Sequence, residues 1–135
     1  MSLRADPLAW VYGVLEGKVR PAIYSQVQQG MPNEFVLINA ITNSPDRQAG
    51  YRHGFHLLAS FTSVAPNDAD AYDNCQRVIN RLLDAFNNDE QAGGLYASMV
   101  EPDNLPTQSP RITAIERRDI FQYTFTIDFY FELPD

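Results

Sequence analysis

The end of the chain alternates between apolar and polar side chains over thirteen residues, from Phe121 to Leu133. The odd-numbered positions are all aromatic or aliphatic, whereas the even-numbered positions carry hydroxyl, amide or carboxylate groups. A period of two is typical of a β-strand with one buried and one wetter face. At about 3.3 Å per residue this strand would span roughly 43 Å, more than twice the usual length. The pattern therefore predicts a sheet whose apolar face is covered by the chain's own helices or by a second copy.

Two stretches have the apolar spacing of amphipathic helices. The first begins at Asp6 and Pro7, which suit the N-cap and the first helical position, and is expected to reach Val19 before Pro21 stops it. The second begins at residues 66–68, with acidic residues in its first turn. Its apolar stripe consists of Ala71, Cys75, Val78, Ile79, Leu82, Leu83 and Phe86.

The other apolar segments are predicted to be strands. They are residues 23–28, 35–42, 51–63, 95–100 and 112–120, and the last of these could continue into the final strand. Residues 35–42 are apolar on both faces, which predicts a central strand covered on both sides. Polar loops are expected at 43–50 and, because of three prolines, at 101–110. The order α-β-β-β-α-β-β predicts an α+β fold, a mostly antiparallel sheet of about five strands with two helices on one face.

Composition narrows the possible classes of protein. A chain of 135 residues predicts a single domain, 1–135. The formal net charge of −7, with one lysine, argues against general affinity for nucleic acid, because binding to phosphates needs a basic surface. A single cysteine excludes an intramolecular disulfide. No apolar run is long enough for a membrane span and no signal-peptide pattern is present, so we expect a soluble protein made in a cytoplasm.

Few residues suggest chemistry. His53 and His56 are three apart on one predicted strand, so they fall on opposite faces and are interpreted as structural or surface histidines. Cys75 lies on the apolar stripe of the second helix and is expected to be buried and unreactive. No phosphate loop, dinucleotide motif, nucleophile elbow or zinc motif occurs. We therefore predict no enzymatic activity, no cofactor and no metal.

The residues most suggestive of an interface are arginines that flank strands and two side chains on the polar face of the final strand. Arginine's planar fork suits carboxylates of a neighbouring subunit, although a solvated face with pairs inside the chain explains the arginines equally well. The candidate subunit-interface or lumen residues are Arg47, Arg52, Arg111, Arg117, Arg118, Thr126 and Asp128.

The whole pattern resembles the small tail-terminator and tail-completion proteins of long-tailed bacteriophages and prophages. The resemblance lies in the opening helix, the strand Phe35–Ala40, the strand His56–Phe61 followed directly by the helix Ala69–Phe86, and the aromatic strand Tyr123–Leu133. It covers most of the chain as an order of elements, without a short diagnostic motif.

The resemblance implies a structural protein of the virion tail, present in the host bacterial cytoplasm before assembly. Subunits of that family form a ring, commonly a hexamer, at the head-proximal end of the tail tube. The ring ends tube growth and joins tail to head, so the implied partners are further copies of the chain, the tail-tube protein and head–tail connector proteins. An acidic surface would suit a channel through which DNA passes without specific binding, since like charges reduce retention.

Two other classes of function stay open. A small-molecule binding module or enzyme would have a mostly apolar pocket, near which Tyr51, Arg52 and His53 would be the first residues to test. An adaptor would instead pair an exposed sheet edge with another protein.

Overall fold

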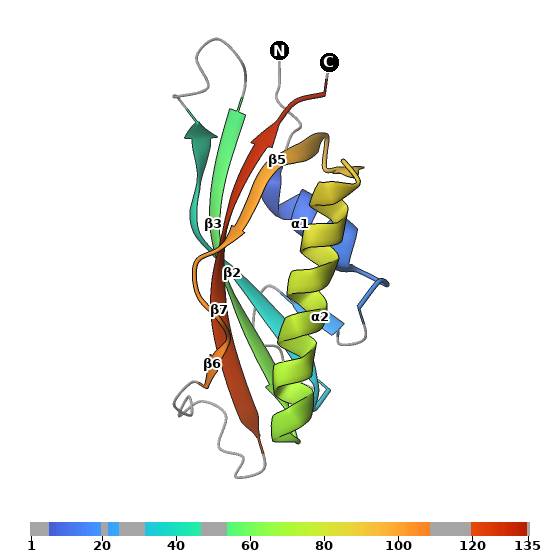
Figure 1. The fold of residues 1–135 in the computed structure, drawn as a ribbon, viewed down its shortest axis with the longest axis vertical. Coiled ribbons are helices and arrows are strands. Elements are labelled where there is room, and N and C mark those ends of the chain that lie inside the picture. The colour runs from blue at the N-terminus through green and yellow to red at the C-terminus, as the bar shows by residue number, and fades with distance from the viewer. Residues whose placement is uncertain (1–5, 20–21, 25–31, 47–53, 109–119, 135) are drawn as a thin grey trace.

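The computed structural model describes residues 6–19, 22–24, 32–46, 54–108 and 120–134. These residues form two helices and seven strands (Figure 1). In chain order the elements are α1 (Pro7–Leu15), β1 (Ala22–Tyr24), β2 (Phe35–Asp46), β3 (Gly54–Ala65), α2 (Asp68–Asn87), β4 (Gln91–Ala92), β5 (Leu95–Pro102), β6 (Thr107–Gln108) and β7 (Phe121–Glu132). The predicted α+β class is therefore confirmed, with more strands than expected because β4 and β6 have only two residues each.

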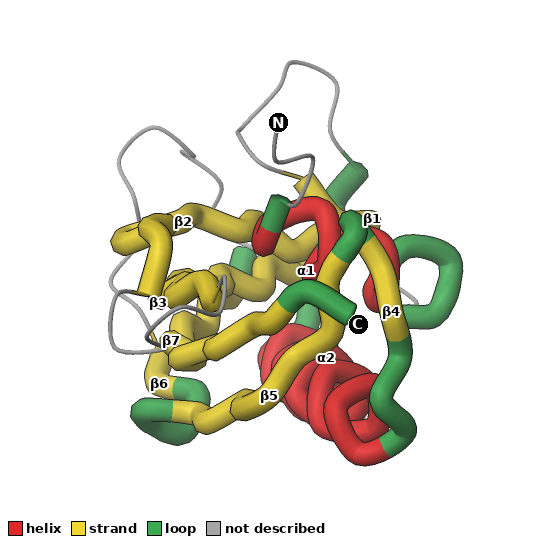
Figure 2. Tube along the Cα trace, turned by 90° about the horizontal axis from the view of Figure 1, so that it is seen from above, coloured by secondary structure: helices red, strands yellow, loops and turns green. Residues whose placement is uncertain are grey.

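All described strands belong to one sheet, in the order β1-β2-β3-β7-β5-β4, with β6 also paired to β7. Every pairing is antiparallel except the parallel pairing of β1 with β2. The final strand, β7, lies inside the sheet, where it pairs along its whole length with β3 and through six residues with β5. Figure 2 shows the strands as one curved layer with α1 and α2 on the same side of it.

The alternation of β7 has the predicted consequence. Phe125, Ile127, Phe129 and Phe131 are buried against the helices, and Trp10 of α1 packs edge-on against Phe129 and Phe131. The chain's own helices thus cover the apolar face. The strand ends at Glu132, one residue earlier than expected.

Both helices begin where the sequence predicts. Asp6 caps α1 by accepting a hydrogen bond from the Leu8 amide, and Asn67 caps α2 by accepting from the amides of Ala69 and Asp70. The predicted stripe of α2 faces the sheet, with Cys75 fully buried. Helix α1, however, ends at Leu15 rather than Val19, because Gly17 adopts a left-handed φ of 75° that breaks the helix.

Other boundaries were wrong. Strand β2 continues through residues 43–46, predicted to be a loop, because they keep pairing with β3 up to Gly54. Its second face is not covered: Ile41 is 55% exposed, since both helices lie on the other side of the sheet. The segment 101–110 was also predicted to be a loop, yet β5 reaches Pro102 and β6 follows. Residues 112–119 of the predicted strand at 112–120, and most of the predicted strand at 23–28, lie outside the described residues.

Candidate assembly surface

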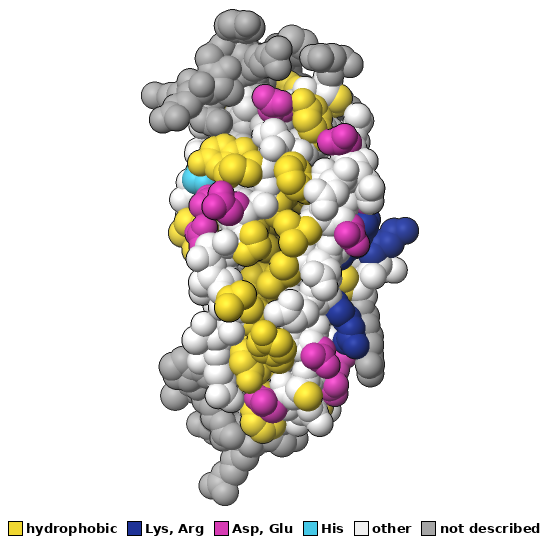
Figure 3. All heavy atoms as spheres, in the orientation of Figure 1, with side chains coloured by type: hydrophobic (Ala, Val, Ile, Leu, Met, Phe, Trp, Pro, Cys, Tyr) yellow, Lys and Arg dark blue, Asp and Glu magenta, His cyan; other side chains and the backbone are white. Residues whose placement is uncertain are grey.

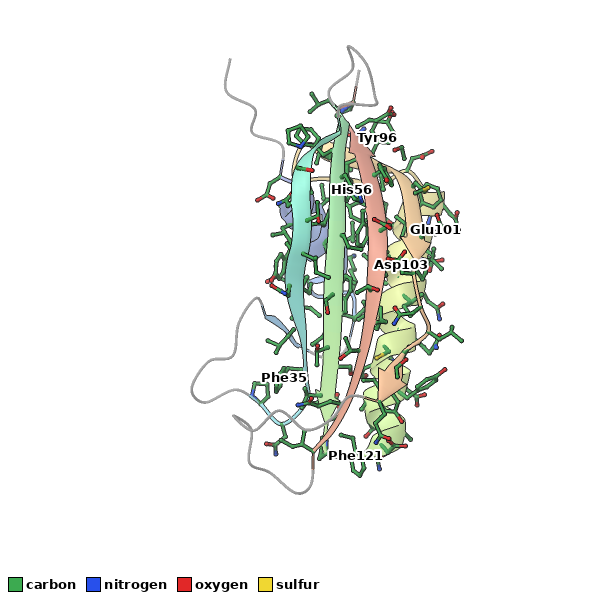
Figure 4. The ribbon with its side chains drawn as sticks, turned by 90° about the vertical axis from the view of Figure 1, so that its left-hand side faces the viewer. Phe35, His56, Tyr96, Glu101, Asp103 and Phe121 are labelled. Atoms are coloured by element: carbon green, nitrogen blue, oxygen red, sulfur yellow. The ribbon has the colours of Figure 1, made fainter. Side chains whose placement is uncertain are left out.

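The sheet face that points away from the helices, here called the outer face, is the surface on which the predicted interface residues Thr126 and Asp128 lie. Figure 4 looks onto this face, which is the left-hand side of Figure 1. Strand β7 contributes Thr124, Thr126, Asp128 and Tyr130, all partly exposed, and β3 contributes the neighbouring row. Gln122, on the same side of β7, is instead buried beside the small apolar cluster that contains Phe35, Val64 and Ile120.

Asp128 has a partner inside the chain. The His56 imidazole Nε2 lies 2.5 Å from Asp128 Oδ1, and both side chains are about one-quarter exposed. The His56 ring also stacks on Tyr130, with ring centroids 4.6 Å apart and an interplanar angle of 18°. The sequence predicted a structural or surface histidine at His56, but it did not predict this pair. The register between β3 and β7 brings the two side chains together, and the periodicity of a single strand does not predict that register.

Two further carboxylates stand beside this pair. Glu101 pairs in register with Asp128, and Asp103 follows just beyond the end of β5 (Figure 4). The pKa of Asp103 is raised above its usual value, first by partial desolvation and then by the negative charge and hydrogen bond of Asp128 and by the charge of Glu101. His56 acts in the opposite direction. The outer face therefore carries an acidic patch, formed by Glu101, Asp103 and Asp128 and partly balanced by one imidazole.

Thr126 also bonds within the chain. Its backbone amide and its hydroxyl both donate to Asn104 Oδ1, at 2.8 and 3.0 Å, while the Thr126 carbonyl accepts from the amide of Asp103. These bonds fasten the turn after β5 onto β7. Thr126 and Asp128 thus support the fold of their own subunit, so Thr126→Lys or a charge reversal at Asp128 would disturb the subunit as well as any contact between subunits.

The predicted arginines cannot be placed on this surface. Arg47, Arg52, Arg111, Arg117 and Arg118 lie outside the described residues. The basic side chains of the described part are Lys18, Arg77 and Arg81, and they gather on the helix side.

Arg81 is the best-connected of these cations. Its guanidinium forms two hydrogen bonds with the Glu90 carboxylate, at 2.6 and 2.8 Å, and its Nε donates to the Val14 carbonyl at 2.7 Å. The pKa of Glu90 is lowered by these bonds. Arg81 therefore ties α2 to α1 and to the segment that leads into β4.

The described residues show little of what an active site needs. No three His, Cys, Asp or Glu side chains among them converge in a way that could hold a metal ion. Cys75 is buried, as predicted, and this desolvation raises the pKa of its thiol to about 12. Neither described helix is long and apolar enough to cross a membrane.

Among the surface hollows of the described part, two are lined as follows. One, of about 300 Å³, lies between the end of α1 and α2 and is lined by Lys18, Val19, Arg77, Asn80, Arg81 and Asp84. The other, of about 360 Å³, is lined by Asp89, Gln91, Tyr96 and Pro134. Both are lined mainly by polar or charged side chains, unlike the largely apolar pockets that usually hold small molecules.

Exposed apolar side chains lie elsewhere. Figure 3 shows a band of hydrophobic side chains over the side of the molecule where β5 and α2 face the viewer. Tyr72 of α2 is 38% exposed and meets the Tyr123 ring edge-on, while Leu105, in the turn between β5 and β6, is 77% exposed. A contiguous band of exposed apolar side chains is typical of surfaces that bind other proteins.

Comparison with known proteins gives a structural match without a match in sequence. The chain matches no protein-family model and no curated protein. Its fold is similar to a chain of the solved structure "Virion of native gene transfer agent (GTA) particle", with a TM-score of 0.65 over 94% of this chain and 95% of that chain. The two sequences are 13% identical, so the likeness establishes a shared fold.

Proposed function

We propose that this protein is a structural subunit of a phage-like virion. The observation that carries the proposal is the similarity of nearly the whole fold, over 94% of this chain and 95% of the other, to a chain of a virion particle. Because the overlap is almost complete on both sides, the likeness is that of one entire subunit to another rather than of a shared small motif.

Within that class, we propose the tail-terminator role: a ring of copies, commonly six, at the head-proximal end of the tail, which ends tube growth and joins tail to head. The order of elements supports this role, since the opening helix, the strand-to-helix passage from β3 to α2 and the long aromatic β7 are all present. The partners are further copies, the tail-tube protein and the head–tail connector proteins. The site of action is the virion tail, after assembly in the host cytoplasm.

The distribution of charge supports a subunit that lines a channel for DNA. The acidic patch of the outer face lies far from Lys18, Arg77 and Arg81 on the helix side. A wall with fixed negative charge repels phosphates, so a nucleic acid slides past it without being held. Turning the outer face toward the lumen would give the ring this property.

The mass of the protein in solution tests the proposal. Sedimentation velocity and native mass spectrometry over a wide range of concentration should show one closed oligomer, and negative-stain electron microscopy should show rings with a central hole. A strictly monomeric species at every concentration would refute the ring. Rings that retain double-stranded DNA at physiological salt would refute the non-binding lumen while leaving the ring intact.

The small-molecule alternative has weaker support, because the two hollows described above are lined mainly by polar or charged side chains. The sheet-edge alternative agrees better with the structure, since two strand edges are open in the described part of the chain. The same edges could form the contacts between neighbouring subunits of a ring.

A further inference from the structure

Within the described part of the chain, two strands leave part of one edge unpaired. Strand β2 pairs with β1 only through Phe35–Leu37, and β5 pairs with β4 only through Leu95 and Tyr96. Among the described residues, no strand bonds to the outer edge of residues 38–46 or of residues 97–102. Unpaired backbone N–H and C=O groups are a template for another strand. The two edges lie on opposite sides of the sheet, so one subunit offers two different surfaces.

Each open edge has a large exposed apolar side chain beside it. Ile41, 55% exposed, sits at the bulge in β2 where the register with β3 shifts. Leu105, 77% exposed, sits just after the end of β5. Burying either side chain against a neighbour would remove apolar surface from water, and backbone pairing would add to this stabilisation.

Along the strand direction, Ile41 and Leu105 are offset by only two or three residues. Ile41 lies between the row of paired residues that contains Ile127 of β7 and the row that contains Asp128. Leu105 follows Asn104, whose side chain bonds to Thr126 of β7. The separation along β7 is thus two or three residues, about 10 Å at most. The first row is Ala40, Ala59, Ile127 and Pro102, and the second is Thr42, Leu58, Asp128 and Glu101.

Charge decides which edges can meet. The β5 side carries the carboxylates of Glu101 and Asp103, both exposed, whereas β2 has no charged residue from Val36 to Pro45. Two β5 edges brought together would oppose like charges, which is destabilising. A β5 edge against the neutral β2 edge avoids that cost. The charges therefore favour a head-to-tail contact over a symmetric one through β5.

We infer that the β2 edge around Ile41 of one copy packs against the β5 edge around Leu105 of the next copy, with the ring axis running along the strands. A ring relates its subunits by rotation without translation, so contacting edges must overlap in height along the axis, and an offset of two or three residues leaves these two edges overlapping. The inference rests on the proposed function and gives its ring a specific interface.

Two single substitutions, Ile41→Lys and Leu105→Lys, test the contact, with Asn87→Lys as the matched control. Asn87 is exposed at the end of α2, away from both edges, and this variant adds the same charge. Each edge variant alone should sediment as a monomer with an unchanged circular-dichroism melt, whereas the control should assemble like the wild type.

Mixing the two edge variants gives the sharper result. Each retains the surface that the other lacks, so an equimolar mixture should form a one-to-one pair and stop there. A pair formed by one variant alone, or the absence of a pair in the mixture, would overturn the head-to-tail contact. If the wild type is monomeric, the ring itself fails; if the wild type forms rings and the edge variants do too, only this contact fails.

Cross-linking checks the geometry directly. The double variant Ile41→Cys/Leu105→Cys, treated with a bis-maleimide reagent long enough to span this offset, should give a ladder of covalently linked species ending in a closed ring, and each single-cysteine variant should not. Cys75 need not be removed, because it is buried and its thiol is unreactive at neutral pH. Wild-type rings whose double variant gives no ladder would refute the proposed register.

Discussion

Gly93 is the position at which a single added carbon should cost most. It lies in the turn between β4 and β5 with a φ of 58°, and its carbonyl accepts a hydrogen bond from the Asp6 amide at 3.1 Å. A β-carbon placed there would lie 2.8 Å from the Asp6 carbonyl oxygen and 2.9 Å from both the Trp10 nitrogen and the Ala9 β-carbon. Two of these three atoms are backbone, so α1 as a whole would have to move.

The expected loss for Gly93→Ala is the sum of two effects. A left-handed conformation costs a residue with a β-carbon about 1–2 kcal/mol, and overpacking against a fixed backbone costs about 1–3 kcal/mol more. Gly17 supplies the control: its φ is 75°, but nothing lies within 4 Å of an added β-carbon. Gly17→Ala should therefore lose only the first amount, about 1–2 kcal/mol.

Urea denaturation followed by tryptophan fluorescence measures both variants. Trp10 is the only tryptophan and is fully buried beside the turn, so its emission reports the loss of this packing. The free energy of unfolding of Gly93→Ala should fall below that of Gly17→Ala by about 1–3 kcal/mol. Equal losses in the two variants would mean that α1 does not approach the β4–β5 turn as closely as described.

Three other substitutions have defined outcomes. Phe129→Ala removes a fully buried ring and should lower the free energy of unfolding by about 3–5 kcal/mol in urea titrations, and a loss below 1 kcal/mol would contradict its place in the core. Arg81→Met should cost about 1–2 kcal/mol at neutral pH. Because the pKa of Glu90 is lowered in the folded state, the stabilisation from this pair is present above the usual glutamate pKa and lost as the pH falls through the lowered value. The wild type and Arg81→Met should therefore converge in stability on acidification, and a constant difference would refute the pairing. Because the pKa of Asp103 is raised in the folded state, the wild type loses stability as the pH rises from the usual aspartate pKa through the raised value. Asp103→Asn removes this charge and should raise the melting temperature at neutral pH. An unchanged or lower melting temperature would contradict the charge repulsion.

The sequence was sufficient for what depends on local pattern. The period of two in β7, the cap at Asp6, the start of α2 at residues 66–68 and the stripe of α2 are each properties of one segment, and each was confirmed. The predicted strand boundaries were wrong where a partner strand that is distant in the sequence determines them. Residues 43–46 have a loop's composition, including Pro45, yet remain a strand because β3 continues beside them.

The surface was less predictable than the core. Thr126 and Asp128 were identified as outward-facing by alternation alone, but their partners Asn104 and His56 come from segments 22 and 72 residues away. Only the register of the sheet brings these pairs together. The exposure of Ile41 was missed for a similar reason, because an apolar residue in an apolar run gives no sign that one side of its strand is left uncovered.

The place of β7 in the sheet has a consequence for synthesis in the cell. This strand is the last of the described elements to leave the ribosome, yet it lies between β3 and β5 and bonds to both. Until it is made, the β2–β3 hairpin and α2 have no continuous core to close on, and both neighbouring strands expose their edges. Chains that terminate early are thus left unfolded and open to degradation. Only finished chains present the completed sheet, so the topology itself acts as a check on which subunits are competent to assemble.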